Sequence, residues 1–513
     1  MMAEVALVHE FLERNAERLP EKIALVCDGQ RLSYAEIETK ANRLANALNF
    51  LGVQRGDRVA LFLPNSTELV IAIFATLKAG GVFVVINHST KPDKVAYILN
   101  NCQASAFFTW PAQTALAADL LAGIQSLKVA VISGSPLGTA ESDKVYSFEQ
   151  LLAQHSPSRP LKVNIDLDLA CLIYTSGSTG EPKGVMSDHS NVVFAVGSIT
   201  SYLQNHEDDV VIGILPLSFD YGLYQLLMVF SFGGRLVLEK GFTYPAAILE
   251  TIQRERVTGF PGVPTIYSML VNLDLSSYDL SSLRYMSNTA AALPPAHILK
   301  IQQTFPWVIL YSMYGLTETK RTLYLPPEQL ERRPDSVGIA IPGTEVWIED
   351  ENGQRLGGGQ TGELVVRGRH VMRGYWGDPK LSAVRYRSSS ILGERLCYTG
   401  DLFRMDDEGY FYFVARKDDI IKSRGEKVSP KEVENAVYKL EGVQEVAVIG
   451  VQDDVLGQAV KVFVVVKDGN LNEKDILRHC RAHLEDYMVP KYVELVTELP
   501  KTSSGKIKKT DLK

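Results

Sequence analysis

Short apolar runs alternate with longer segments of helical periodicity from the N-terminus to about residue 400. The runs are rich in Val, Ile and Leu, which is typical of strands buried on both faces. Examples are residues 58–63, 82–86, 129–132, 210–214 and 235–238, and helical patterns such as 34–51 and 66–79 lie between them. This alternation predicts an α/β fold of largely parallel sheets covered by helices on both faces.

The pattern changes towards the C-terminus. Residues 409–414 alternate as a hairpin strand, and Ser429 and Pro430 stand where a helix would be capped and begin. Strands over 444–451 and 460–466 and a helix over 473–484 are expected after them. We therefore predict two domains, a large one over residues 1–401 and a small α+β domain over residues 402–513.

Composition and charge narrow the function classes. The 513 residues carry a net charge of −7, which argues against a general nucleic-acid binder, whose surface would be basic. The most apolar stretch, residues 69–87, is interrupted by Lys78 and two glycines, so a core helix and strand are expected there and no membrane span. The acidic, helical N-terminus does not read as a signal peptide. The cysteines are scattered and form no Cys-x-x-Cys pair: Cys27, Cys102, Cys171, Cys397 and Cys480. This pattern indicates reduced thiols in a cytoplasmic protein and argues against a metal site built from cysteines.

The stretch from Tyr174 to Gly184 is the strongest chemical signal. It follows an apolar run and combines glycines, hydroxyls and one lysine, which suit a phosphate chain because the backbone can approach closely and turn its N–H groups inward. Gly184 follows the lysine, so the spacing differs from that of a Walker P-loop. A flexible linker is the alternative, and the Pro-Lys-Gly beside a buried strand disfavours it. The candidate residues are Thr175, Ser176, Gly177, Ser178, Thr179, Gly180 and Lys183.

Four further motifs carry polar groups at residues 314–318, 398–401, 416–427 and 500–509. The first joins an aromatic ring to a hydroxyl–carboxylate pair, which could stack on a base and hold a cation beside phosphates. The second ends in Asp401, which could accept both hydroxyls of a ribose. Taken singly, each has an ordinary explanation as a surface loop, a solvated charge run or a basic tail.

In this order and at these separations, the motifs resemble the adenylate-forming superfamily of acyl-CoA synthetases, stand-alone amino-acid adenylation enzymes and luciferases. The resemblance runs from Leu32 through residues 77–81 and 362–364 to Lys506. It implies a large α/β domain with a β-barrel-like part and a small mobile domain. It also implies an AMP-forming acid–thiol ligase that uses ATP and Mg²⁺.

The resemblance assigns roles by position. Thr317 would touch the α-phosphate, Glu318 would ligate magnesium, and Lys506 would bridge the carboxylate and the α-phosphate during adenylation. Asp418 matches the hinge about which the small domain turns for the second half-reaction. One departure is Ala415, because the family usually has Gly before the ribose-binding arginine. Besides the loop residues, the implied ATP- and AMP-binding residues are Thr289, Ala290, Ala291, Tyr314, Gly315, Asp401 and Arg416.

The acid is indicated by Phe219 and Asp220. Amino-acid-adenylating members carry Phe-Asp here, and the aspartate pairs with the substrate ammonium. A partly buried carboxylate without a cationic partner is costly, so an amino or imino acid is our first hypothesis. The alternatives are that Asp220 only caps a helix beginning at Tyr221, and that the enzyme is an acyl-CoA synthetase for a small or medium non-amino acid.

The same alignment suggests a moderately sized, partly apolar pocket. Lys320 and Arg321 are unusual beside it. They could read a second carboxylate or a polar substituent, but we favour contacts with phosphate, solvent or an internal acid. The expected pocket residues are Asp220, Tyr221, Tyr224, Pro261, Met286, Asn288, Met313, Arg321 and Thr322.

The thiol acceptor stays open. No phosphopantetheine attachment motif appears in the chain, so we expect a stand-alone enzyme whose acceptor is coenzyme A or a separate phosphopantetheinylated carrier protein. A luciferase-type adenylating oxygenase has no positive support. A silent nucleotide-binding module is disfavoured because Lys183, Glu318, Asp401, Arg416 and Lys506 are all retained.

Overall fold

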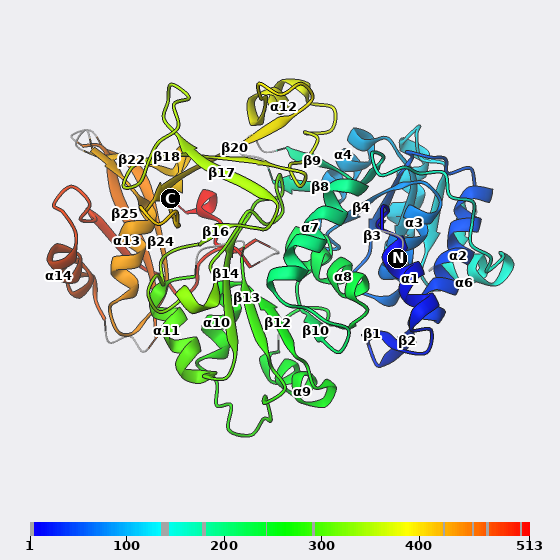
Figure 1. Ribbon diagram of the computed structural model, residues 1–513, viewed down its shortest axis with the longest axis horizontal. Coiled ribbons are helices and arrows are strands. Elements are labelled where there is room, and N and C mark those ends of the chain that lie inside the picture. The colour runs from blue at the N-terminus through cyan, green and yellow to red at the C-terminus, as the bar shows by residue number, and fades with distance from the viewer. Residues whose placement is uncertain are drawn as a thin grey trace.

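The computed structural model describes residues 5–134, 143–176, 181–242, 244–289, 293–423, 426–453, 456–467, 471–502 and 505–512. Within them the chain forms two largely parallel sheets, an antiparallel sheet and a smaller C-terminal sheet (Figure 1). This confirms the predicted α/β class with a large N-terminal domain and a small C-terminal one. In Figure 1 the small domain lies at the left of the view, and α7 and α8 lie near the centre.

The first sheet has the strand order β7-β6-β5-β3-β4-β8-β9 and is parallel except for the pair β8 and β9. The expected strand over 82–86 is β4 and that over 129–132 is β6, because continuous apolar runs are strong local signals. The strands are β3 (Arg58–Phe62), β4 (Val82–Ile86), β5 (Ala104–Thr109), β6 (Val129–Ile132), β7 (Val145–Ser147), β8 (Leu169–Ser176) and β9 (Pro182–Asp188).

The second sheet has the order β16-β15-β14-β13-β12-β10-β11-β1-β2 and is parallel from β14 to β1. Its edge strands β2, β15 and β16 run antiparallel. The strands are β1 (Ile23–Cys27), β2 (Gln30–Ser33), β10 (Val210–Gly213), β11 (Arg235–Leu238), β12 (Gly259–Gly262), β13 (Tyr285–Asn288), β14 (Ile309–Tyr314), β15 (Leu323–Tyr324) and β16 (Ile339–Ala340).

Helices cover both sheets. One apolar core contains residues of both sheets together with α2, α3, α7 and α8, so these helices join the two halves of the large domain. Helix α2 begins where expected because Ser33 and Glu36 form a capping box. The helices of this domain are α1 (Glu10–Arg18), α2 (Tyr34–Phe50), α3 (Thr67–Lys78), α4 (Pro92–Cys102), α5 (Thr114–Gly123), α6 (Phe148–Gln154), α7 (His189–Tyr202), α8 (Asp220–Phe232), α9 (Pro245–Glu255), α10 (Pro264–Leu270), α11 (Pro295–Thr304) and α12 (Pro379–Arg385).

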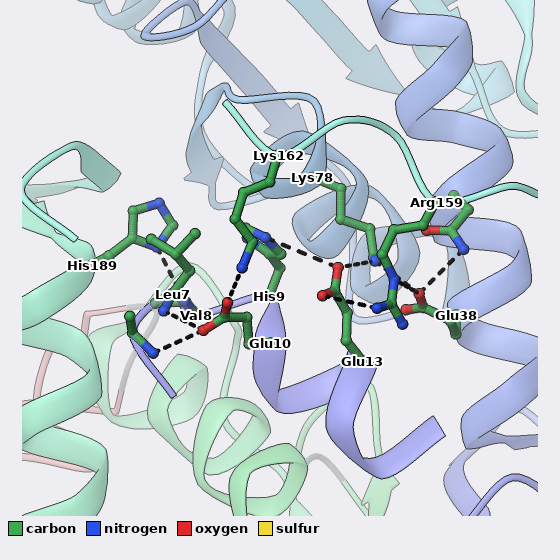
Figure 2. A network of polar contacts seen from close by, with 12 residues as sticks. Leu7, Val8, His9, Glu10, Glu13, Glu38, Lys78, Arg159, Lys162 and His189 are labelled. Carbon is green, nitrogen blue, oxygen red and sulfur yellow. Dashed lines mark hydrogen bonds and ion pairs between the residues drawn. The ribbon is translucent and has the colours of Figure 1, made fainter. Parts of the chain in front are cut away.

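A buried ion network fixes the N-terminal helix α1 to α2 and α3 (Figure 2). Lys78 Nζ lies 2.5 Å from Glu13 Oε1 and 2.9 Å from Glu38 Oε1, and the Lys78 side chain is 1% exposed. Arg159 reaches both acids, at 3.7 Å from Glu13 and 3.4 Å from Glu38. Lys78, which argued against a membrane span in the sequence, therefore has a structural partner on each neighbouring helix. Among the described residues, no helix combines the length and apolar character needed to cross a membrane.

The third sheet, formed by strands within residues 344–416, is antiparallel. Its order is β17-β18-β20-β19. The strand β21 also pairs with β20, over residues 401–405, whereas β19 pairs with residues 395–397. The strands are β17 (Thr344–Glu349), β18 (Thr361–Gly368), β19 (Tyr386–Ser388), β20 (Arg395–Met405) and β21 (Phe411–Arg416).

The domain boundary predicted after Asp401 falls inside β20. Because β20 and β21 pair from Asp401–Arg416 to Met405–Phe411, the hairpin over 409–414 belongs to the third sheet and not to the small domain. The chain first leaves this sheet at the short 3-10 turn η3 (Lys417–Asp419), which contains Asp418. We propose that the boundary lies there.

The small domain has a core of its own between one sheet and two helices. The predicted strands and the last predicted helix are present, with longer strands than expected. The elements are β22 (Ile421–Ser423), β23 (Glu426–Val428), α13 (Pro430–Tyr438), β24 (Val443–Asp453), β25 (Gly457–Val466), α14 (Glu473–His483) and β26 (Tyr492–Leu495). Ser429 caps α13, as the sequence predicts.

Candidate active site

The glycine-rich stretch connects β8 to β9. These strands pair antiparallel, with Thr175 opposite Lys183, so both residues stand at the base of the connecting loop. On the edge of β9 that faces away from β8, the Trp376 N–H donates a hydrogen bond to the Gly184 carbonyl at 2.7 Å. Residues 177–180, which include Gly177, Ser178, Thr179 and Gly180, lie outside the described residues, as does the side chain of Ser176. The structure therefore shows the two paired strands that hold the ends of this loop.

The residues expected to hold the nucleoside come together. The Tyr314 hydroxyl, at the end of β14, donates to Asp401 Oδ2 at 2.6 Å, and Arg416 Nε lies 3.8 Å from Asp401 Oδ1. Burial raises the pKa of the Asp401 carboxyl above its ordinary value. Ala415 has no positive φ, so the departure from glycine at this position is free of backbone strain.

Gly315 is required by a close approach of the backbone. A Cβ at this position would lie 1.9 Å from the Lys320 carbonyl oxygen. The backbone over 315–320, which contains Thr317 and Glu318, therefore folds back on itself. On the neighbouring strand, Thr289 follows β13 and is buried, whereas Ala290 and Ala291 lie outside the described residues.

Glu318 is held by groups that the sequence did not reveal. The Tyr375 hydroxyl donates to Glu318 Oε1 at 2.6 Å, and Arg385 Nε lies 3.4 Å from the same hydroxyl. Among the described residues, no cluster of three or more His, Cys, Asp or Glu side chains could hold a metal. One carboxylate fits Mg²⁺ bound together with substrate phosphates, because magnesium needs few protein ligands there.

Lys506 reaches this site from the small domain. Its backbone closes a tight turn with Thr502, and its Nζ lies 5.3 Å from the centroid of the Phe219 ring. Burial, followed by repulsion from Arg416, lowers the pKa of Lys506 to about 8, and attraction to Asp220, Glu318 and Asp401 opposes this shift. The lysine of the small domain therefore packs against Phe219 of the large domain, where the acidic residues of that domain raise its pKa against the effect of burial.

Asp220 has an internal cationic partner, which corrects the argument for an amino substrate. Lys320 Nζ lies 2.8 Å from Asp220 Oδ1, and Arg321 Nη1 lies 3.7 Å from Oδ2. The Lys320 side chain is fully buried, and Asp220 is 5% exposed. The premise that this carboxylate lacks a cation was wrong. The capping alternative was also wrong, because Phe219 is the N-cap of α8 and Asp220 is its first residue.

The remaining pocket residues are buried, and their tyrosines and methionines are divided between two apolar cores. Tyr224 and Met313 belong to the core between the sheets, whereas Tyr221 and Met286 belong to the second core. The Tyr221 hydroxyl donates to the Ser287 carbonyl at 2.6 Å. The other expected members, Pro261, Asn288 and Thr322, lie on β12, on β13 and just before β15.

Sequence reasoning missed Tyr375, Arg385 and the contact of Phe219 with Lys506. Tyr375 and Arg385 follow Glu318 by 57 and 67 residues in the chain. No motif of the sequence links residues that far apart. The weak signal in the sequence was Gly374, directly before Tyr375, and in the structure it has a φ of +136°, which favours glycine.

Fold and site together define an ATP-dependent, acid-activating enzyme. The AMP-binding enzyme family matches residues 12–376 and its C-terminal domain matches residues 432–506. The chain therefore belongs to the AMP-binding enzyme family and is an AMP-forming acid–thiol ligase.

Curated relatives align over nearly the whole chain. A long-chain-fatty-acid–CoA ligase of Bacillus subtilis (strain 168) is 32% identical, over 98% of this chain and 93% of the relative. A feruloyl-CoA synthase of Amycolatopsis sp is 34% identical, over 98% and 97%.

Solved structures show the same architecture. The anthranilate CoA ligase AuaEII in complex with anthranoyl-AMP superposes with a TM-score of 0.91 at 28% identity, covering 100% of this chain and 97% of that one. ATP-bound MatB from Rhodopseudomonas palustris gives a TM-score of 0.87 at 29% identity, covering 98% of each chain.

Proposed function

We propose that this protein is an acyl-CoA synthetase that converts a non-amino carboxylic acid, ATP and coenzyme A into an acyl-CoA, AMP and pyrophosphate. The observation that carries the proposal is the Asp220–Lys320 ion pair, which removes the need for a substrate ammonium. The relatives named as CoA ligases support coenzyme A as the acceptor. The amino- or imino-acid–carrier-protein ligase, our first hypothesis, loses its main support.

In the first half-reaction a carboxylate attacks the α-phosphorus of ATP, and two anions must approach each other. Lys506 would place a positive charge where the negative charges meet, a contribution worth about 3 kcal/mol or more in a site from which water is excluded. Lys183 and the hydroxyls of residues 175–179 would hold the pyrophosphate leaving group. Tyr314, Asp401 and Arg416 would hold the nucleoside. Glu318 would hold Mg²⁺, which would neutralise phosphate charge when bound.

In the second half-reaction the coenzyme A thiol attacks the acyl carbon and AMP leaves. Lys506 has no role in that step, so the small domain would turn about Asp418 and carry the lysine away. Asp418 suits a hinge because it is exposed, lies in a one-turn 3-10 segment and stands between the last strand of the third sheet and the first strand of the small domain.

The test is a competition between acceptors. The purified chain is incubated with ATP, Mg²⁺ and three acid panels (fatty, aryl and amino acids), with coenzyme A and a phosphopantetheinylated carrier protein present together. Acyl-CoA from a fatty or aryl acid is the expected product. Aminoacyl carrier protein without acyl-CoA would overturn the proposal. Acid-dependent oxygen uptake would identify a luciferase-type oxygenase, and ATP binding without pyrophosphate release would identify a silent module.

A further inference from the structure

Arg321 is buried with part of its guanidinium unused. It is 2% exposed, and its Nε and Nη2 atoms have no hydrogen-bond partner among the residues that the structure describes. The guanidinium contacts the Tyr221 ring, whose centroid is 4.4 Å from Cζ, and Asp220, whose Oδ2 is 3.7 Å from Nη1. A buried charged donor without an acceptor is costly, so the unpaired guanidinium edge points to a missing ligand group.

The charges around Asp220 do not balance. Lys320 Nζ lies 2.8 Å from this carboxylate and also donates to the Thr317 carbonyl at 3.2 Å, so Lys320 already supplies one positive charge to Asp220. Arg321 then adds a second positive charge to a single carboxylate. The Asp220–Lys320–Arg321 group therefore carries one positive charge in excess.

The unused atoms form the edge that suits a carboxylate. Nε and Nη2 point the same way and bind two carboxylate oxygens side by side, as Arg55 binds Asp168 in this chain at 2.9 Å for both contacts. Arg321 is linked through its neighbours Asp220 and Lys320 to residues expected to act in adenylation. Asp220 follows Phe219, which contacts Lys506, and Lys320 contacts Thr317.

We infer that the acid activated by this enzyme carries a second carboxylate, which Arg321 binds through its Nε and Nη2 atoms. This inference rests on the proposed function and names the class of its substrate, a dicarboxylic acid. One carboxylate would meet ATP near Lys506 and Thr317, and the other would neutralise the excess charge at Arg321. Tyr221 would support the guanidinium from its face, as the cation–π contact already does.

The test compares each diacid with its half-amide, which has nearly the same shape and lacks the second charge. Succinate, glutarate, adipate and terephthalate are paired with their half-amides, and kcat/KM for acyl-CoA formation is measured for each. We expect at least one diacid to exceed its half-amide by about 100-fold, the size of a buried charge-assisted contact. Arg321→Gln should reduce that ratio below about tenfold, and Arg321→Lys should give an intermediate ratio because it keeps the charge and loses the paired edge.

Arg333→Gln is the matched control. Arg333 is also a buried arginine, 6% exposed and stacked on Tyr410 at 4.0 Å, but it pairs with Asp406 and Glu408 away from the site. Its substitution should leave the diacid ratio unchanged.

Half-amides or simple monoacids used as well as diacids by the unsubstituted protein would overturn the inference and leave the acyl-CoA synthetase standing. That comparison needs no variant to fold. A diacid preference that persists in both Arg321 variants would remove the assignment to Arg321. Absence of acyl-CoA from every acid would count against the proposed function itself, and the inference would fall with it.

Discussion

Lys320 Nζ lies 2.8 Å from Asp220 Oδ1 in the interior of the large domain, although Lys320 follows Asp220 by 100 positions in the chain. Asp220→Ala should therefore act on folding as well as on activity. Removing one partner of a buried pair costs about 3–5 kcal/mol of unfolding free energy, because the other charge stays buried alone. Urea unfolding measures this loss.

The double variant Asp220→Leu/Lys320→Met is the control for this pair. Removing both charges should recover part of the stability, because Lys320 is then no longer left unpaired, although the buried Arg321, 3.7 Å from Asp220, still loses its anion. An Asp220→Ala protein of unchanged stability that loses exchange with amino acids alone would instead identify a substrate ammonium as the partner.

The protonation of Lys506 should set the upper limit of the pH profile. Its pKa is lowered to about 8, so the ammonium is present below that pH and is lost as the pH rises through it. We expect kcat/KM for ATP to be flat below pH 8 and to fall above it. Lys506→Arg should abolish the fall, and Lys506→Ala should be slower by about 100-fold at pH 7 and show no such step. The same alkaline fall in Lys506→Ala would assign it to another group.

Tyr375 should act by positioning the Glu318 carboxylate. Tyr375→Phe deletes the hydroxyl that donates to Glu318 at 2.6 Å, and a hydrogen bond to a charged group is worth about 2 kcal/mol. We expect kcat/KM for ATP to fall by about tenfold or more and the Mg²⁺ concentration at half-maximal rate to rise. Tyr386→Phe is a close control, because its hydroxyl is buried without a hydrogen-bond partner among the described residues. Equal rates in the two variants would show that the Tyr375–Glu318 contact is dispensable.

Asp418 should affect only the second half-reaction. Asp418→Pro restricts the backbone of the turn and should keep pyrophosphate exchange while slowing acyl-CoA formation. Single-turnover measurements starting from ATP and from the acyl adenylate separate the two steps. Equal loss of both steps would count against the hinge.

Local signals predicted much of the fold. The strands β4 and β6 and the helix α2 follow from continuous apolar runs and a capping box, and each depends on residues close in the chain. Local signals did not predict that β20 continues through the expected domain boundary after Asp401. The Thr399–Gly400 pair reads as a turn, yet Gly400 has a φ of +71° within β20, and the strand continues through it to Met405.

The residues expected to hold the nucleoside lie in contiguous motifs, and the structure brings Tyr314, Asp401 and Arg416 together. The partners of Asp220 and Glu318 could not be predicted in this way. Lys320 is an unusual cation in the sequence, but the sequence does not show where its side chain points. The tight turn at Gly315 and the contacts of Lys320 with Asp220 and Tyr224 of α8 determine this. Tyr375 reaches Glu318 only because the segment 374–376 pairs with β9, a contact that no spacing in the sequence encodes.

The fate of the carboxylate oxygen tests the central claim most directly. The acid is labelled in both carboxylate oxygens with a heavy isotope, and AMP is analysed by mass spectrometry after turnover with coenzyme A. If the carboxylate attacks the α-phosphorus and the thiol then displaces AMP, one labelled oxygen stays on AMP and the other remains in the thioester. Unlabelled AMP accompanied by acyl-CoA would mean that no acyl adenylate forms, and it would contradict the account.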